Sequence, residues 1–245
     1  HIIFSFKSYF HSKTVIPIKT VLIGITSRDN KTTESEISKI NSPTFDRIII
    51  FDAFNTCPTD IINDKALEII SLEKFSMTQI YQTVIDIVTE DIVVFYQLDG
   101  SQNPDDIPAM IAHSKMGYDL VIASRFILEG SRYDSDYLIP FRGMGNRLFT
   151  LLLNLFFDAN LGDSFQSFRC VSLKFLKASY LDSEVLFNYQ MSIKAVLLKQ
   201  KIFEIPTIEK QSISPKSLTS ALWSGLLSIG MLIREKYKNK SYTRI

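Results

Sequence analysis

The chain has 245 residues, 46% of them hydrophobic and 22% charged, with a formal net charge of +1 at pH 7. This composition belongs to a globular protein with a sizeable core and excludes an intrinsically disordered chain. The near-neutral charge argues against a dedicated nucleic-acid-binding protein, whose surface is usually basic. The two cysteines, Cys57 and Cys170, are far apart and lack metal-ligand spacing, which favours a reduced, cytoplasmic compartment.

Strand-like and helix-like segments alternate along the first half of the chain. Runs rich in β-branched and aromatic residues predict strands at 20–25, 47–51, 66–70, 92–96 and 119–123. Apolar residues at helical spacing predict helices at 76–89 and 105–116. This alternation predicts an α/β fold with a mostly parallel central sheet and helices on both faces.

The pattern changes after about residue 125. Two apolar helices are predicted at 146–157 and 185–199, and a short strand follows at 201–205. Because no linker separates the two parts, we expect one domain over 1–245. Its first half, about 20–125, is of a nucleotide-binding type, and its second half, about 126–216, is expected to face an acceptor.

The strand-like run 92–98 has no charged residue and ends at Asp99-Gly100. A strand of this composition is buried on both faces of a sheet. Ligands of open α/β sheets bind beyond the carboxyl ends of such strands, where a carboxylate can hold a divalent cation and, through it, a diphosphate. The alternative is an ordinary strand–turn–helix unit, in which Asp105 and Asp106 complement the dipole of the following helix.

Several motifs follow one another between residues 99 and 206. They are D-G-S-Q-N-P-D-D from Asp99, G-Y-D-L-V-I-A-S-R ending at Arg125, the pair Arg142 and Asn146, D-S-F-Q-S-F-R from Asp163, and E-I-P at 204–206. In order and spacing this set resembles the family-2 glycosyltransferases. The closer resemblance is to their polyprenyl-phosphate subgroup, which includes the dolichyl-phosphate mannose and glucose synthases.

The resemblance implies a GT-A fold and an inverting glycosyltransferase that moves a sugar from a nucleotide-diphosphate donor to a polyprenyl-phosphate carrier. It implies a Mg²⁺ or Mn²⁺ cofactor held by Asp99 with Gln97, and a donor site that also includes Asp52 and Ser101. Gln97 stands where the family's D-x-D motif has its first Asp. We therefore expect weaker cation binding than at a site with two carboxylates.

The same resemblance places Arg125, Arg142 and Asn146 around the acceptor phosphate. The planar guanidinium of Arg suits phosphate oxygens, and Arg142 and Asn146 are one helical turn apart. Arg125 and Asp163 join Asp99 as the expected catalytic residues, with Asp163 serving if a base is needed. A phosphate acceptor is already an anion and needs no general base, whereas a hydroxyl acceptor normally does.

Structural alternatives stay open for these side chains. For Arg125 and Arg142 the alternative is a surface salt bridge with nearby acids. Asp163 has structural and acceptor-side roles as equal alternatives, and Arg169 is expected to tie loops together. The three histidines form no cluster in the sequence, and none is interpreted as a metal ligand.

The region 217–245 predicts contact with a membrane surface. Residues 217–233 carry no charge and have leucine and isoleucine at helical spacing. The basic residues of the tail that follows include Lys236, Lys238, Lys240 and Arg244. Such a segment suits an anionic membrane surface and is short for a spanning helix. We expect a cytoplasmic protein, peripheral at the membrane; the alternative is a core helix with a solvated tail.

Two other functions stay open. One is transfer to a glycan hydroxyl by the same fold, again in cell-envelope or glycan biosynthesis. The other is a degenerate glycosyltransferase fold that binds a partner without catalysis. Gln97 favours the second, as do departures from the family at 24–30, where an N-E loop is usual, and at 51–54, where D-D-G-S is usual.

Overall fold

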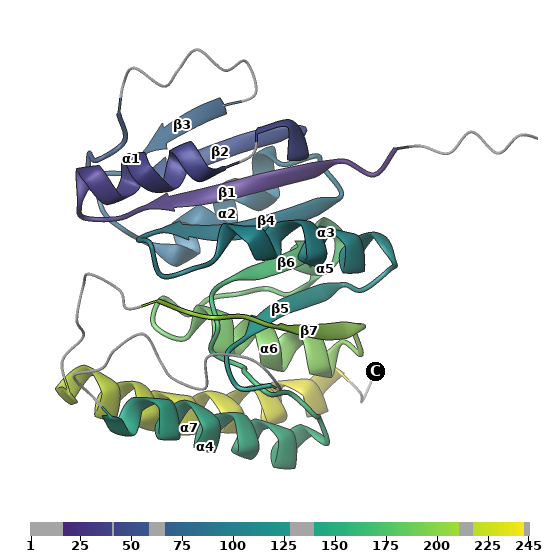
Figure 1. Ribbon diagram of the computed structural model, residues 1–245. Coiled ribbons are helices and arrows are strands. Elements are labelled where there is room, and N and C mark those ends of the chain that lie inside the picture. The colour runs from purple at the N-terminus through teal and green to yellow at the C-terminus, as the bar shows by residue number, and fades with distance from the viewer. Residues whose placement is uncertain (1–16, 41, 59–66, 128–139, 211–217, 243–245) are drawn as a thin grey trace, which may run out of the picture.

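The computed structural model describes residues 17–40, 42–58, 67–127, 140–210 and 218–242 (Figure 1). Strands from both halves of the sequence form one seven-stranded sheet in the order β3-β2-β1-β4-β6-β5-β7. In chain order they are β1 (Thr20–Thr26), β2 (Arg47–Asp52), β3 (Leu67–Ser71), β4 (Ile92–Leu98), β5 (Leu120–Ser124), β6 (Arg169–Ser172) and β7 (Ile202–Pro206).

Helices cover both faces of the sheet (Figure 1). They are α1 (Asn30–Lys39), α2 (Met77–Ile87), α3 (Ile107–Lys115), α4 (Pro140–Phe157), α5 (Leu173–Ala178), α6 (Phe187–Leu197) and α7 (Leu218–Tyr242). Short 3-10 turns precede β2 and α3, at Ser42–Thr44 and Pro104–Asp106.

The sheet is mostly parallel, as the sequence predicts. β1 pairs in parallel with both β2 and β4, β2 with β3, and β5 with β7. β6 is antiparallel to its neighbours β4 and β5, so every other strand ends at the same edge. Strand order changes direction between β1 and β4, which makes the carboxyl ends of these two strands the expected ligand position.

Alternating side chains of the strands fill two apolar layers. On one face, Val21 and Ile23 of β1 pack in a core that includes residues of α2, α5 and α6. On the other face, Leu22 packs in a core that includes residues of α1 and α3. A third cluster joins α4, α6 and α7 through residues such as Leu153, Tyr189 and Leu232.

The predicted strands and the apolar helices are confirmed, with ends shifted by a few residues. The sequence reading missed α1 because its sequence is polar, and of its ten residues Thr33, Glu36 and Ile37 are the buried ones. It also missed β6, which has four residues and begins with an arginine. Neither segment shows the apolar periodicity on which sequence-based assignment depends.

The last helix is longer than the predicted 217–233 because α7 continues through the basic stretch to Tyr242. Figure 1 shows α7 beside α4 below the sheet, and the two helices are in contact. No helix within the described ranges has the length and apolar character needed to cross a membrane. The side chain of Lys240 and the whole of Arg244 lie outside the described part of the chain.

Candidate functional site

Asp99 lies directly after β4 at the point where the strand order changes direction. Its Oδ1 accepts hydrogen bonds from the backbone nitrogen of Ser101 at 3.0 Å and from Ser101 Oγ at 2.6 Å. Gly100 between them has φ +77, a conformation that side chains other than glycine rarely adopt. This Asp-Gly-Ser turn therefore fixes one oxygen of the Asp99 carboxylate at the carboxyl edge of the sheet.

A buried carboxylate lies close to the Asp99 turn. Glu36 of α1 is 3% exposed, and its Oε2 accepts a hydrogen bond from Tyr96 Oη at 2.5 Å. Its Oε1 lies 3.6 Å from the position that a Cβ on Gly100 would take. Burial, and then the bond to Glu36, raises the pKa of Tyr96. Lys39 Nζ pairs with the same Oε1 at 2.5 Å, so the charge of Glu36 is already balanced, and Asp99 is the carboxylate of this turn that is proposed to meet a cation.

Gln97 is half-buried between two fully buried neighbours on β4. Its backbone nitrogen donates to Oε1 of Gln102 at 2.9 Å, and Gln102 Nε2 donates to Ser167 Oγ at 3.0 Å. Gln102 is itself 3% exposed. The amide of Gln102 thus ties the end of β4 to the loop that precedes β6.

Asp52 ends β2, and its carboxylate organises the loop that follows. Its two oxygens accept bonds from Thr26 Oγ1 at 3.1 Å and from the backbone nitrogens of Phe54, Thr56 and Cys57 at 3.3, 3.1 and 3.2 Å. Asp52 is 5% exposed. The sequence predicts a donor-binding role; the structure places Asp52 at the same edge of the sheet as Asp99, with its oxygens occupied by the loop.

An aromatic and cationic cluster at the same edge has no signal in the sequence motifs. Phe54 and Phe75 stack with ring centroids 6.0 Å apart, and the Arg28 guanidinium lies 5.3 Å from the Phe54 centroid. These residues follow β2, β3 and β1, respectively. The Phe54 ring with the Arg28 guanidinium beside it offers a stacking surface for a planar, electron-rich part of a ligand.

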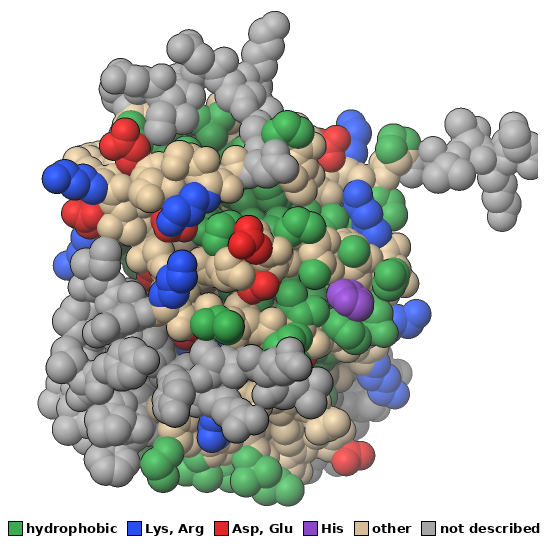
Figure 2. Space-filling view, in the orientation of Figure 1, with side chains coloured by type: hydrophobic (Ala, Val, Ile, Leu, Met, Phe, Trp, Pro, Cys, Tyr) green, Lys and Arg blue, Asp and Glu red, His purple; other side chains and the backbone are tan. Residues whose placement is uncertain are grey.

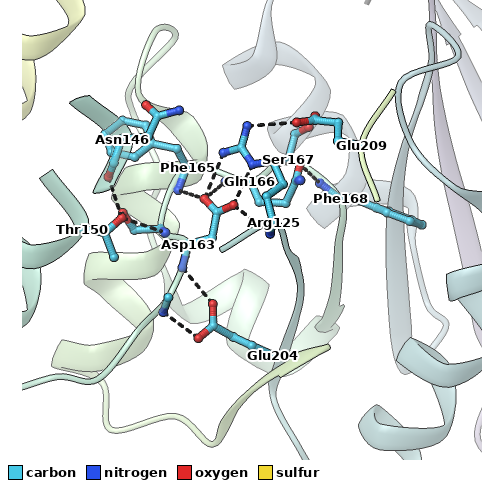
Figure 3. Close-up of polar contacts among 12 residues, drawn as sticks. Arg125, Asn146, Thr150, Asp163, Phe165, Gln166, Ser167, Phe168, Glu204 and Glu209 are labelled. Atoms are coloured by element: carbon cyan, nitrogen blue, oxygen red, sulfur yellow. Dashed lines mark hydrogen bonds and ion pairs between the residues drawn. The ribbon is translucent and has the colours of Figure 1, made fainter. Parts of the chain in front are cut away.

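On the acceptor side, Arg125 and Asp163 form a buried two-point ion pair (Figure 3). Arg125 Nε and a terminal nitrogen donate to the two Asp163 oxygens at 2.7 and 3.0 Å, and the Arg125 backbone nitrogen adds a bond at 3.2 Å. Arg125 is 4% exposed and Asp163 is 0% exposed. Sequence reasoning named both residues, and the structure brings them together as partners.

Asp163 also shapes its own loop. Its Oδ1 accepts bonds from the backbone nitrogens of Phe165 and Gln166 at 3.3 and 3.2 Å. Glu204 of β7 holds the loop from the other side by accepting from the backbone nitrogens of Gly162 and Asp163 at 2.7 and 2.9 Å. Burial raises the pKa of Glu204. The number of donors on Asp163 favours its structural role over that of a free base.

Arg169 supports the same loop from within the core. It is fully buried and donates to the backbone oxygens of Gln166 and Ser164 at 2.5 and 2.8 Å and to Ser192 Oγ at 2.9 Å. Burial lowers the pKa of Arg169 to about 9. These contacts match the loop-tying role expected for Arg169.

The segment after β7 joins the acceptor side to the Asp99 turn. Glu209 pairs with Arg125 at 3.0 Å, and the backbone nitrogen of Lys210 donates to the Ser101 carbonyl at 2.8 Å. Thr207 Oγ1 donates to Asp106 at 2.6 Å. Glu209 was not predicted, because it belongs to none of the motifs. Asp106 is the N-cap residue of α3, at the helix N-terminus where the sequence places it; its side chain makes no cap bond and accepts from Thr207.

The other predicted acceptor residues lie on α4. Thr150 Oγ1 bonds the backbone oxygen of Asn146 and Ser164 Oγ, at 2.8 and 2.7 Å, which ties α4 to the Asp163 loop (Figure 3). Arg142 belongs to the first turns of α4, but its side chain lies outside the described part of the structure. Thr150 and Ser164 thus tie the turn of α4 that carries Asn146 to the loop that carries Asp163.

No model of a known protein family matches this chain, and no curated protein sequence matches it. Solved structures do. Glucosyl-3-phosphoglycerate synthase from Mycobacterium tuberculosis with UDP is 16% identical, with a TM-score of 0.67 over 89% of this chain and 80% of that one. Its complex with Mn²⁺, UDP and glucosyl-3-phosphoglycerate has a TM-score of 0.65 over the same shares, also at 16% identity.

The complex of that synthase with Mg²⁺ and UDP is 14% identical, with a TM-score of 0.64 over 89% of this chain and 79% of that one. At this level of identity the similarity speaks to the fold. The sheet of seven strands, mostly parallel and covered by helices, is that of the GT-A glycosyltransferases, as the sequence predicts.

Proposed function

We propose that the protein is a glycosyltransferase that moves a sugar, with inversion, from a nucleotide-diphosphate donor to the phosphate of a polyprenyl-phosphate carrier. The observation that carries the proposal is the position of Asp99, at the carboxyl end of β4 where the strand order changes direction, in a GT-A fold. The similar synthase has been solved with UDP and Mn²⁺ or Mg²⁺. We expect this chain to use the same classes of ligand.

The donor side fits a cation held by one carboxylate. Within the described ranges, no three His, Cys, Asp or Glu side chains are arranged to hold a metal ion. Mg²⁺ is often bound through one or two carboxylates, with substrate phosphates supplying further ligands. We propose Asp99 as that carboxylate, with Gln97 offering a neutral oxygen. When bound, Mg²⁺ or Mn²⁺ would neutralise charge on the leaving diphosphate.

The other donor residues would position the nucleotide. Ser101 fixes the Asp99 carboxylate, and Asp52 fixes the loop that carries Phe54. We propose that Phe54, with Arg28 beside it, contacts the nucleotide base by stacking. Asp52 would then contribute to donor binding through the shape of this loop.

On the acceptor side, Arg125 is the central residue. Its guanidinium is held by Asp163 at two points and by Glu209 at one. We propose that an acceptor phosphate takes the place of Glu209 on Arg125, because phosphate oxygens suit the same fork of donors. Arg142 and Asn146 on α4 would bind the remaining oxygens.

The state of Asp163 supports a phosphate acceptor over a glycan hydroxyl. A hydroxyl needs a base to accept its proton, whereas a phosphate is already an anion. Asp163 is fully buried and bonded to Arg125 and to backbone nitrogens, so its oxygens are engaged within the protein and are not open to a substrate hydroxyl. The non-catalytic alternative is supported by Gln97 and by the occupied oxygens of Asp52.

We propose that the described halves act as one domain, with 20–125 binding the donor and 126–216 the acceptor, and with 217–245 contacting the membrane. Because the carrier is a lipid, the reaction would take place at the cytoplasmic face of a membrane. The protein would therefore be peripheral there.

The test is sugar transfer by the purified full chain. UDP- and GDP-sugars labelled in the sugar are incubated with Mn²⁺ and either polyprenyl phosphate in detergent or a soluble oligosaccharide. We expect label in the lipid fraction, with the anomeric configuration inverted, and none from Asp99→Asn. Label in the oligosaccharide alone would contradict the lipid acceptor, and no transfer with any donor would favour the non-catalytic alternative.

A further inference from the structure

Helices α4 and α7 lie side by side and run in the same direction. Phe149 packs against Gly225, where an added Cβ would be 3.1 Å from the Phe149 ring. Further along, the Lys236 ammonium lies 4.8 Å from the Phe156 ring centroid. The inner sides of the pair are committed to the core, because Leu153, Met231 and Leu232 are buried in the cluster with α6.

The outer sides of the same helices expose large apolar side chains. On α4 they are Met144, Leu148, Leu151, Leu155 and Phe156, and on α7 they are Trp223, Leu226, Ile229, Ile233 and Tyr237. Leu155 is 71% exposed and Leu226 is 65% exposed. Apart from Phe156, which adjoins Leu155, their spacing of three and four residues places them along one stripe on each helix. We call this surface the α4–α7 face.

Figure 2 shows hydrophobic side chains gathered along the lower edge of the molecule, where Figure 1 places α4 and α7. Soluble proteins rarely expose a contiguous apolar patch that runs along two helices without a use for it. The α4–α7 face is therefore a docking surface, and its charges indicate the partner.

The exposed charges carried by α4 and α7 themselves are positive, and two exposed acids border them: Asp158 follows α4, and Asp182 pairs with Arg234 and Lys238. α4 contains no Asp or Glu. The single acid of α7, Glu235, is 1% exposed and pairs with Lys194 and Arg234, each at 2.7 Å. Burial raises the pKa of Glu235, but these hydrogen-bonded cations lower it overall. Exposed cations of the two helices include Arg147 and Lys236.

We propose that the α4–α7 face docks the protein on an anionic lipid bilayer. An apolar stripe flanked by cations is the pattern of helices that lie in the membrane interface, where anionic lipids attract the cations. A second copy of the chain is a poorer partner, because docking face to face would bring cations against cations. The opposite sides of α4 and α7 pack against α6, so the exposed α4–α7 face is the part of these helices that would meet lipid.

The docking itself does not require sugar transfer, and its link to the acceptor residues rests on the proposed function. α4 carries Asn146 and Thr150, and Thr150 bonds Ser164 in the Asp163 loop. A bilayer against the outer side of α4 would thus lie next to the proposed acceptor residues. The phosphate of a lipid carrier, which sits at the bilayer surface, would need no extraction from the membrane to reach Arg125.

The test is flotation of the full chain with vesicles of phosphatidylcholine alone or mixed with phosphatidylglycerol. We expect binding to the mixed vesicles that weakens with salt. The triple variant Leu151→Glu, Leu155→Glu, Leu226→Glu should lose at least about tenfold in affinity, because three apolar side chains that would enter the bilayer become anions that an anionic surface repels. The matched control is Met116→Glu, Tyr180→Glu, Val185→Glu, which adds the same three charges at exposed apolar residues outside the face.

Light scattering and nucleotide titration complete the experiment. The triple variant should stay folded and should bind UDP as the wild type does. Equal vesicle binding by wild type and triple variant, or no binding by either, would overturn the proposal. So would a dimer without lipid that the triple variant abolishes. Failure of docking with intact transfer to a carrier in detergent would refute the docking and leave the proposed function standing.

Discussion

The donor edge and the acceptor loops hold their carboxylates in different ways. At the donor edge, Asp52 and Asp99 accept hydrogen bonds from backbone nitrogens and hydroxyls of their own turns. On the acceptor side, Asp163 and Glu209 pair with the buried cation Arg125. A turn tolerates loss of its carboxylate charge, whereas a buried ion pair does not. The two regions should therefore respond differently to the same substitution.

The largest expected effect is on stability. Asp163→Asn leaves the buried Arg125 guanidinium with Glu209 as its remaining charged partner, and breaking a buried pair costs about 3–5 kcal/mol. Asp99→Asn at the donor edge keeps a side-chain oxygen that can accept the Ser101 bonds, and we expect a loss of about 1 kcal/mol or less. Urea unfolding of both variants measures the difference. Equal midpoints would show that the two regions are not distinct.

The second effect concerns the backbone of the Asp163 loop. A Cβ on Gly162 would clash with Cγ2 of Ile127 and lie 3.3 Å from Ser124 Oγ, so Gly162→Ala should destabilise the fold by about 1–3 kcal/mol. The matched control is Gly145→Ala on α4, where a Cβ meets nothing within 4 Å. Alanine is the better helix former, so that variant should gain up to about 1 kcal/mol.

Thermal unfolding of both alanine variants checks this contrast. If Gly162→Ala unfolds at the same temperature as the wild type, the loop can shift to accommodate the added methyl group, and the tight packing assigned to the acceptor side would be wrong.

The sequence predicts more of the donor edge than of the acceptor loops. Asp99 was found because an uncharged strand ending in Asp-Gly is a local signal. Arg125 and Asp163 were named one by one, but their pairing joins residues 38 apart and no local pattern encodes it. Glu209 and Phe75 were missed for the same reason: their partners are distant in the chain, and only the fold brings them together.

The same distinction applies to the elements. Buried strands such as β4 can be predicted from their apolar composition. Helix α1 is polar, and its features in the structure are the Asp29 cap and a few buried residues. β6 is stabilised by pairing with β4 and β5 on either side. Its four residues contain too little periodicity to reveal it in isolation.

The smallest expected effect is a pH dependence on the acceptor side. Burial raises the pKa of Glu204 in the folded protein, so the folded state holds this proton more tightly than the unfolded chain does. The stability from this group is present below the ordinary Glu pKa and is lost as pH rises through the raised one. Glu204→Gln should remove that loss. The free energy of unfolding of the wild type and of Glu204→Gln is measured across this pH range. If it changes with pH in the same way for both proteins, the raised pKa of Glu204 is wrong.

The most direct test of the central claim is calorimetric titration of the folded protein with UDP and GDP, with and without Mn²⁺, repeated on Asp99→Asn. If Asp99 anchors a cation that binds a nucleotide diphosphate, one nucleotide will bind in a Mn²⁺-dependent manner and the variant will lose that dependence. Binding that is unchanged in Asp99→Asn would contradict the role of Asp99. No binding of either nucleotide by folded wild-type protein would contradict a working donor site.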